Sequence, residues 1–300
     1  MTPQDRTREG LLLGVLAVAA FSLSLPATRA AVPELGAATV GLGRAVVAAV
    51  LAGVLLAVRR DRLPERRYWP RLALVAGGVV VGNPLLSAVA LRDMPSAHGA
   101  VLIGLLPGAT AVAAVLRARE RPSMAFWAAS AAGLACVLAL ATAQGAGRIT
   151  AGDGLVLLAV VAGALGYAEG GALARELGSW RVICWALVLS APVLVPVVAL
   201  SVSAQVLEAS PRAWLGFGYV SIVSMFLGFL AWYRAMALGG VARLSQLQLL
   251  QPLLTLFWSA VLLGEEVNRG TVGTAGLVML CVLAGVRSRV QQEPVVRPIS

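Results

Sequence analysis

Residues 232–267, WYRAMALGGVARLSQLQLLQPLLTLFWSAVLLGEEV, have a counterpart 145 residues earlier in the chain. Residues 87–122, SAVALRDMPSAHGAVLIGLLPGATAVAAVLRARERP, align with them without a gap, and this shift places Pro107 on Pro252. The same register also matches Ala90 with Ala235, Ala97 with Ala242 and Glu120 with Glu265. A repeat at a fixed spacing predicts that the chain consists of two similar structural halves.

The repeat predicts the domain organisation. Residues 1–148 are expected to form the first half, residues 149–287 the second half, and residues 288–300 a disordered tail. Each half holds five apolar blocks, and five is an odd number, so the second half should enter the membrane in the opposite orientation. Inverted repeats of this kind are a transporter architecture, with the substrate site near the midplane where the halves meet.

The composition predicts a membrane protein. The chain is 59% hydrophobic and 13% charged, whereas a typical soluble domain has about 25% charged residues. A membrane-spanning helix needs about 20 largely apolar residues. Ten blocks satisfy this requirement, which predicts an all-α polytopic protein with ten spans: 10–31, 34–58, 70–91, 96–116, 123–143, 154–174, 181–204, 212–236, 241–263 and 270–287.

The arginines predict the orientation. All 24 basic residues are arginine. Sixteen lie in the two terminal segments and in the loops that follow the even-numbered spans, and four lie in the other loops. Because positively charged loops stay in the cytoplasm, we expect both termini to be cytoplasmic and the protein to lie in the inner (plasma) membrane. The basic excess therefore indicates topology and contact with lipid headgroups, and does not indicate nucleic-acid binding.

Several classes of function are disfavoured by missing residues. Without lysine the chain has neither a Walker A phosphate loop nor a Schiff-base nucleophile, and no ATP-binding subunit is required by its sequence. The cysteines Cys136, Cys184 and Cys281 lack metal-site spacing. We therefore expect no cofactor, no metal and no enzyme activity, with a small molecule and membrane lipid as partners. The oligomeric state stays open.

The paired segments resemble a known family. The motif ending in ARERP and the motif ALGG.A.LSQLQ.LQP…LLGEEV are similar to those of the EamA-type drug/metabolite transporter (DMT) superfamily. The resemblance covers nearly the whole chain, although Arg119 stands where the family has glycine before the acidic residue. Within the superfamily the chain is most similar to YddG-type exporters of aromatic amino acids.

This resemblance implies a secondary transporter that exports small organic metabolites by alternating access through a central cavity. Amino acids, with aromatic ones preferred, are the first expectation. Export of cationic drugs or other metabolites of the superfamily is an alternative, and an intramembrane lipid-handling protein is another. A single arginine near the midplane argues against phosphate substrates, and tryptophans together with glutamine and asparagine suit a zwitterion with an apolar side chain.

The ninth predicted helix carries a polar stripe. At 100° per residue, Gln248 and Gln251 share one face with Ser245, Thr255 and Ser259, while Gln246 points elsewhere, towards a neighbouring helix. Hydrogen bonds between helices also explain serine and threonine in membranes. We predict that Gln248 and Gln251 contact the substrate.

Two charged residues within the spans are candidate substrate ligands. Arg44 lies near the middle of the second span and Glu169 in the inner half of the sixth. Tyr167, two residues before Glu169, is a further predicted substrate contact. Charges inside the membrane are costly and usually functional. Arg44 would attract a carboxylate, and Glu169 an amine or a coupled proton. A structural ion pair is the alternative for both, and it is the favoured interpretation for Glu169.

The remaining candidates are uncharged or lie at a helix end. Substrate contacts are predicted for the polar Asn83 and Ser87, for Ser224 on the small-residue face of the eighth span, and for two tryptophans, although helix packing explains the same residues. The single histidine, beginning the fourth span, is either a titrating gate or a solvated cap. Prolines within spans are predicted kinks. The candidate substrate contacts are therefore Asn83, Ser87, Ser224, Trp185 and Trp232, the candidate gate is His98, and the candidate kinks are Pro84, Pro107 and Pro252.

Overall fold

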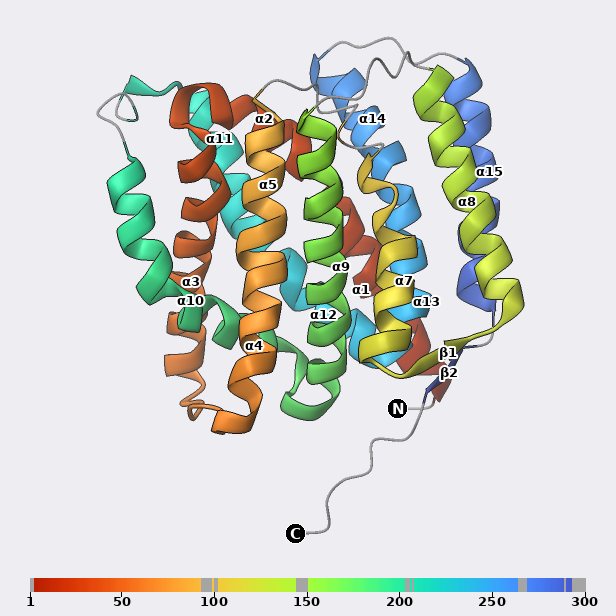
Figure 1. The fold of residues 1–300 in the computed structure, drawn as a ribbon, viewed down its shortest axis with the longest axis horizontal. Helices are drawn as coiled ribbons and strands as arrows, with labels where there is room; N and C mark the ends of the chain where they lie inside the picture. Colours follow the sequence, from red (N-terminus) through yellow and green to blue (C-terminus); the bar gives the residue numbers. More distant parts are fainter. Residues whose placement is uncertain are drawn as a thin grey trace.

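The fold is a bundle of helices that run roughly parallel to one axis (Figure 1). This computed structural model describes residues 3–92, 99, 102–143, 151–202, 206, 208–263, 269–288 and 290–292. Six helical segments are long and apolar enough to cross a membrane, and shorter apolar helices accompany them. Within the described residues, every one of the ten predicted spans contains helix.

The elements of the first half begin at the N-terminus and end before residue 144. They are α1 (Pro3–Ser22), α2 (Ser24–Leu35), η1 (Thr39–Gly43), α3 (Arg44–Val58), η2 (Arg66–Tyr68), α4 (Trp69–Val75), η3 (Ala76–Gly82), α5 (Asn83–Ala90), α7 (Leu106–Arg117), β1 (Glu120–Pro122) and α8 (Met124–Ala143).

The second half contains the longest uninterrupted helix. Its elements are α9 (Ala151–Leu177), α10 (Ser179–Ser201), α11 (Pro211–Gly218), η5 (Tyr219–Gly228), α12 (Phe229–Gly239), α13 (Val241–Ser245), η6 (Gln246–Leu249), α14 (Leu250–Leu263), α15 (Arg269–Arg287) and β2 (Val290–Gln292).

The three predicted kink prolines stand where regular α-helix is interrupted. Pro84 follows the π-helical segment η3, Pro107 follows a turn at residues 104–105, and Pro252 follows the 3₁₀ segment η6. Proline lacks an N–H and clashes with the carbonyl four residues earlier, so the preceding backbone cannot keep the α-helical hydrogen-bond pattern. The residues four positions before these prolines, Val80, Ile103 and Gln248, are all buried.

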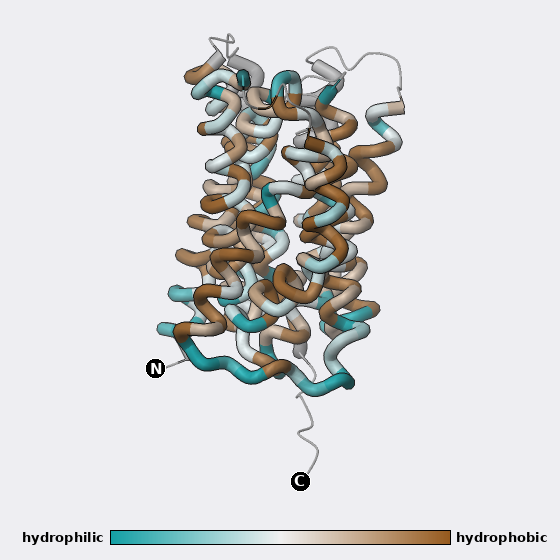
Figure 2. The backbone as a smooth tube through the Cα atoms, turned by 90° about the vertical axis from the view of Figure 1, so that its left-hand side faces the viewer, coloured by the Kyte–Doolittle hydropathy of each residue, from teal (hydrophilic) through white to brown (hydrophobic). Residues whose placement is uncertain are grey.

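The arginine-rich connections lie at one end of the bundle. The start of α1, the α3–α4 and α9–α10 connections and the β1–β2 pair lie together at the lower end of Figure 1. Figure 2 shows the same end as a band of hydrophilic backbone. The connections that the arginine count assigns to one side therefore do share one end, which is called the basic end below.

Part of the predicted disordered tail is ordered, so this expectation is wrong for residues 290–292. These residues form β2 and pair antiparallel with β1, with Glu120 opposite Gln292 and Pro122 opposite Val290. Backbone hydrogen bonds to β1, which lies beside the end of α15 (Figure 1), provide the order that the polar local sequence did not indicate.

Two helix backbones approach closely where η3 crosses α9. A Cβ atom added to Gly78 would lie 2.5 Å from the Ala162 carbonyl oxygen and 2.9 Å from the Gly166 Cα, both backbone atoms. A Cβ atom added to the adjacent Gly77 would meet nothing within 4 Å. Small residues therefore allow two backbones to approach here, and only one of the paired glycines is needed for it.

We expect Gly78→Ala to lower thermal stability and Gly77→Ala to leave it nearly unchanged. Overpacking a site that cannot relax costs about 1–3 kcal/mol, and backbone atoms of α9 cannot move aside alone. Thermal unfolding of both purified variants in the same detergent, followed by size-exclusion fluorescence, measures the difference. Equal melting temperatures for the two variants would contradict the proposed contact.

Candidate substrate site

A cavity lies among the helices of both halves, in the part of the bundle away from the basic end. Most of the predicted substrate ligands line it: Arg44, Asn83, Ser87, Tyr167, Ser224 and Gln251, together with Pro84. It offers about 50 Å³ of free space. One water molecule needs roughly 10–15 Å³ measured in this way, so the space accommodates a few waters and a larger ligand would require the helices to separate.

Among the described residues that line this cavity, Arg44 is the only cation. Its side chain is buried at the start of α3, and its Nη2 donates a hydrogen bond of 3.2 Å to the Ser224 hydroxyl. Its Nε has no hydrogen-bond partner, and no described carboxylate pairs with it. A buried charge without a counter-charge is costly, so the guanidinium is available to an anionic ligand.

Three serine hydroxyls share the cavity lining with the guanidinium. Ser24 donates a hydrogen bond of 2.7 Å to Ser224, which joins the first and eighth spans across the cavity. The buried Ser87 hydroxyl has no partner. Ser24 escaped the sequence analysis because a serine at a helix break is unremarkable until its partner, 200 residues away, is known.

Asn83 uses its amide nitrogen for structure. The Nδ2 atom donates a hydrogen bond of 2.9 Å to the Ala159 carbonyl in α9. Its side chain is packed closely enough that a Cβ atom added to Gly163 would lie 3.1 Å from Nδ2. Asn83 therefore ties the interrupted third span to α9 while it lines the cavity.

An aromatic cluster closes the cavity on the side of the basic end. The ring of Phe21 lies 5.1 Å from that of Phe229 and 6.5 Å from that of Tyr167, which in turn lies 5.7 Å from Trp232. Phe21, Tyr167 and Phe229 face the cavity, whereas Trp232 is fully buried behind them with its indole N–H unpaired. Phe21 and Phe229 were missed because isolated phenylalanines are also normal lipid contacts.

The three glutamines of the ninth span face different surroundings. Gln251 lines the cavity. Gln248 is buried within reach of the Tyr167 hydroxyl, but neither of its amide atoms forms a well-aligned hydrogen bond. Gln246 packs against Gly285 of α15, also without a partner. The helical phase thus separates Gln246 from the other two, as the sequence predicts, even though a 3₁₀ segment interrupts the helix.

The rest of the polar stripe bonds to neighbouring backbone. The Thr255 hydroxyl donates to the Ser22 carbonyl at 2.7 Å, and the Ser245 hydroxyl donates to the Ala242 carbonyl at 2.7 Å. These are the interhelical and local hydrogen bonds that were the alternative interpretation for such residues. The Ser259 side chain lies outside the described part of the chain.

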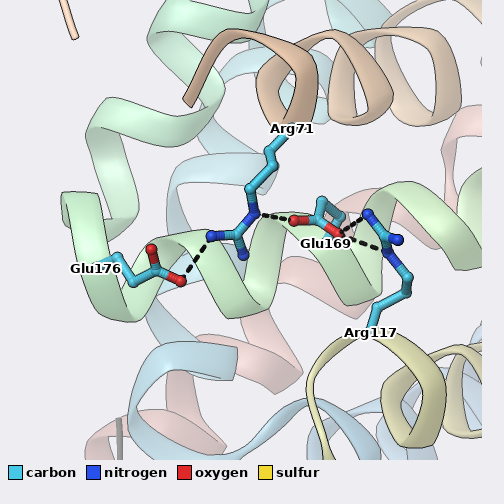
Figure 3. A network of polar contacts seen from close by, with 4 residues as sticks. All are labelled: Arg71, Arg117, Glu169 and Glu176. Carbon is cyan, nitrogen blue, oxygen red and sulfur yellow. Dashed lines mark hydrogen bonds and ion pairs between the residues drawn. The ribbon is translucent and has the colours of Figure 1, made fainter. Parts of the chain in front are cut away.

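Glu169 does not line the cavity and instead forms an ion-pair network at the basic end (Figure 3). Its buried carboxylate accepts from Arg71 Nε of α4 and from Arg117 Nη2 of α7, the latter at 2.6 Å. Arg71 also pairs with Glu176 at 2.7 Å. The network links α4, α7 and α9, which favours the structural interpretation of Glu169.

Trp185 and His98 do not join the cavity residues. The Trp185 indole donates a hydrogen bond of 3.1 Å to Asp61, which also pairs with Arg181 at 2.8 Å. This cluster anchors the α3–α4 connection to α10 at the basic end. His98, the predicted gate, lies outside the described residues, as does the Gly264-Glu265 motif.

A second buried carboxylate closes the basic end. Glu120 is fully buried and accepts hydrogen bonds from the backbone N–H groups of Val241 at 2.9 Å and Ala242 at 2.7 Å, at the start of the ninth span. Arg175 lies 3.5 Å from the same carboxylate. An acidic group at a helix N-terminus satisfies unpaired N–H groups and complements the helix dipole. The repeat alignment had singled out this glutamate without a role.

Comparison with known proteins establishes the family. The model of the EamA-like transporter family matches residues 8–142 and, a second time, residues 150–286. The chain belongs to the EamA-like transporter family. This confirms the resemblance to the drug/metabolite transporter superfamily, and the family domain occurs twice in the chain. The protein is therefore an all-α, multi-pass membrane transporter.

Two relatives and one solved structure resemble this EamA-like transporter. "Uncharacterized transporter YdeK" of Bacillus subtilis (strain 168) is 45% identical over 283 residues, which cover 94% of this chain and 99% of the relative. A "probable terminal-alkyne amino-acid exporter" of Streptantibioticus cattleyicolor is 27% identical and covers 89% of this chain and 91% of the relative. A crystal structure with 19% identity has a TM-score of 0.73 over 93% of this chain and 98% of its own, and so shares the fold.

Proposed function

We propose that this EamA-like transporter exports amino acids, with aromatic ones preferred, from the cytoplasm across the inner membrane. The observation that carries the proposal is the Arg44 guanidinium, buried in the central cavity without a described carboxylate partner. A substrate carboxylate would supply the missing counter-charge. The adjacent rings of Phe21, Tyr167 and Phe229 would contact an apolar or aromatic side chain.

The same lining argues against a cationic drug as the principal substrate. No aspartate or glutamate is among the described residues that line the cavity. Glu169, the carboxylate that could have attracted an amine, is already engaged by two arginines. The amino-acid exporter among the relatives, although distant at 27% identity, supports the same substrate class.

The transport cycle we propose is alternating access between two inverted halves, with both termini in the cytoplasm. The cavity lies on the side of the aromatic cluster away from the basic end, so this conformation would be closed to the cytoplasm. Glu169 and Glu120 hold that end closed through contacts between the halves. Loading from the cytoplasm would require the aromatic cluster and both carboxylate contacts to open.

Counterflow in proteoliposomes tests this function. Purified protein would be reconstituted in vesicles preloaded with one unlabelled amino acid, and uptake of a labelled panel would be followed with and without a pH gradient. We expect accumulation of labelled aromatic amino acids above that of empty vesicles. Accumulation of organic cations with no response to any amino acid would refute the proposal. Stimulation by the pH gradient would identify proton coupling.

The three glutamines of the ninth span, of which Gln251 lines the cavity and Gln248 is buried close to Tyr167, provide a matched set of variants. We expect Gln251→Leu and Gln248→Leu to raise the KM for export at least ten-fold, because a hydrogen bond to a charged group contributes about 1.5–3 kcal/mol. Gln246→Leu, on the same helix but against α15, should leave the KM unchanged. Initial rates in proteoliposomes measure this. A Gln246 variant as impaired as the other two would contradict the assignment of the polar face.

A further inference from the structure

A second cavity lies at the basic end of the bundle, apart from the substrate site. It has a volume of about 430 Å³ and opens between the end of α3, the start of α10 and the middle of α12. Its lining combines apolar, aromatic and cationic side chains: Leu55, Arg59, Ser179, Trp180, Leu230 and Arg234. None of these residues lines the central cavity.

The charge of this groove is positive. Arg59 is exposed at the end of α3 and pairs with no described carboxylate. Arg234 pairs with Glu9 at 3.1 Å, so one negative charge offsets one of the two arginines. Among the described residues the groove therefore keeps one arginine without a carboxylate partner, and Leu55 and Leu230 line the same groove. This combination suits an anionic group with an apolar body.

The position of the groove identifies the anionic group. Arg59 and Arg234 lie near the level where the spans meet the basic end, and Trp180 is half-buried at the first turn of α10. Tryptophan at this level is typical of the membrane interface, where lipid headgroups lie. Leu55 and Leu230 stand one turn deeper on the same helices as Arg59 and Arg234. A free phosphate would contact only the arginines, whereas a phospholipid would contact the arginines through its phosphate and the leucines through an acyl chain.

We propose that this groove, here called the lipid groove, binds one anionic phospholipid from the leaflet at the basic end. The phosphate contacts Arg59 and Arg234, and an acyl chain lies on Leu55, Trp180 and Leu230. The groove lies between α10 of the second half, α12 and the end of α3, so a bound lipid contacts both halves of the transporter.

Native mass spectrometry of the purified protein tests the proposal. The protein would be released from detergent after incubation with phosphatidylglycerol or phosphatidylcholine, and the bound lipid would be counted at increasing lipid concentration. We expect one tightly bound phosphatidylglycerol and no equivalent phosphatidylcholine. Arg59→Gln should weaken phosphatidylglycerol binding about five-fold, since one arginine near an anionic surface contributes about 1 kcal/mol.

Matched variants separate the groove from the general basic surface. Arg62→Gln removes the same charge from the exposed connection three residues away and should leave the tightly bound lipid in place. Leu230→Trp fills the groove without changing its charge and should also displace the lipid. Equal losses in the Arg59 and Arg62 variants, or retention of the lipid in Leu230→Trp, would overturn the proposal. Full displacement by inorganic phosphate would instead identify a free-anion site and overturn it as well.

Discussion

Replacing Arg44 with leucine is expected to abolish amino-acid export while the protein remains folded in the membrane. The guanidinium is the cation of the central cavity, and its loss removes the counter-charge for a substrate carboxylate. Folding should not suffer, because an arginine within a span is costly, up to about 2.5–3.5 kcal/mol at a helix centre on insertion scales, and the one described hydrogen bond of Arg44 is to Ser224. Counterflow of labelled amino acids and thermal unfolding of the same preparation measure both parts.

Two controls make the Arg44 result specific. Arg44→Lys keeps the charge but loses the planar donor pair that fits a carboxylate, so export should be reduced rather than lost. Amino-acid amides lack the carboxylate, so in the wild-type protein they should compete poorly with the labelled amino acid for export. Full export of a free amino acid by Arg44→Leu would end the assignment of Arg44 as its carboxylate ligand.

The largest expected effect on stability comes from removing both arginines that surround Glu169. The double variant Arg71→Gln, Arg117→Gln leaves a carboxylate that is 1% exposed without a counter-charge. Breaking a buried pair in this way costs about 3–5 kcal/mol. We expect a large fall in melting temperature, or loss of folded protein. Each single variant should be milder, because the remaining arginine still contacts Glu169.

A charge-neutral triple variant tests the cause of this loss. Adding Glu169→Gln to the double variant removes the buried charge and should restore most of the stability. Glu169→Gln alone should be tolerated better than the double arginine variant, because Arg71 and Arg117 are 30% and 43% exposed and can reach water. Melting temperatures of all four proteins form a cycle that isolates the coupling. A triple variant no more stable than the double variant would contradict the ion-pair explanation.

The fold class followed from local sequence properties. Hydropathy is a sum over neighbouring residues, so the ten apolar blocks were recognisable without knowledge of their partners. The arginine count likewise identified which connections share one end, because charge placement in loops obeys a rule that ignores packing. The polar face of the ninth helix followed from helical phase, and Gln246 indeed lies apart from the cavity.

Predictions from local sequence were wrong where contacts with distant parts of the chain determine the structure. Residues 290–292, Val-Gln-Gln, carry no strong local signal for a strand, yet they pair with β1. Trp185 resembles a substrate contact in sequence but donates to Asp61, 124 residues earlier in the chain. In both cases the partner lies on another element, and its identity depends on how the helices rotate and cross.

The sequence alone determined that this is a polytopic helical transporter with two related halves and an arginine-rich end. The tertiary structure decided which buried polar groups meet: Arg44 with Ser224 rather than with a carboxylate, and Glu169 with Arg71 and Arg117 rather than with the cavity. The physical reason is that apolar length and loop charge act along the chain, whereas the pairing of a buried charge depends on the rotation of each helix about its axis. That rotation is set by close packing between helices far apart in the sequence, such as the crossing of η3 and α9 at Gly78.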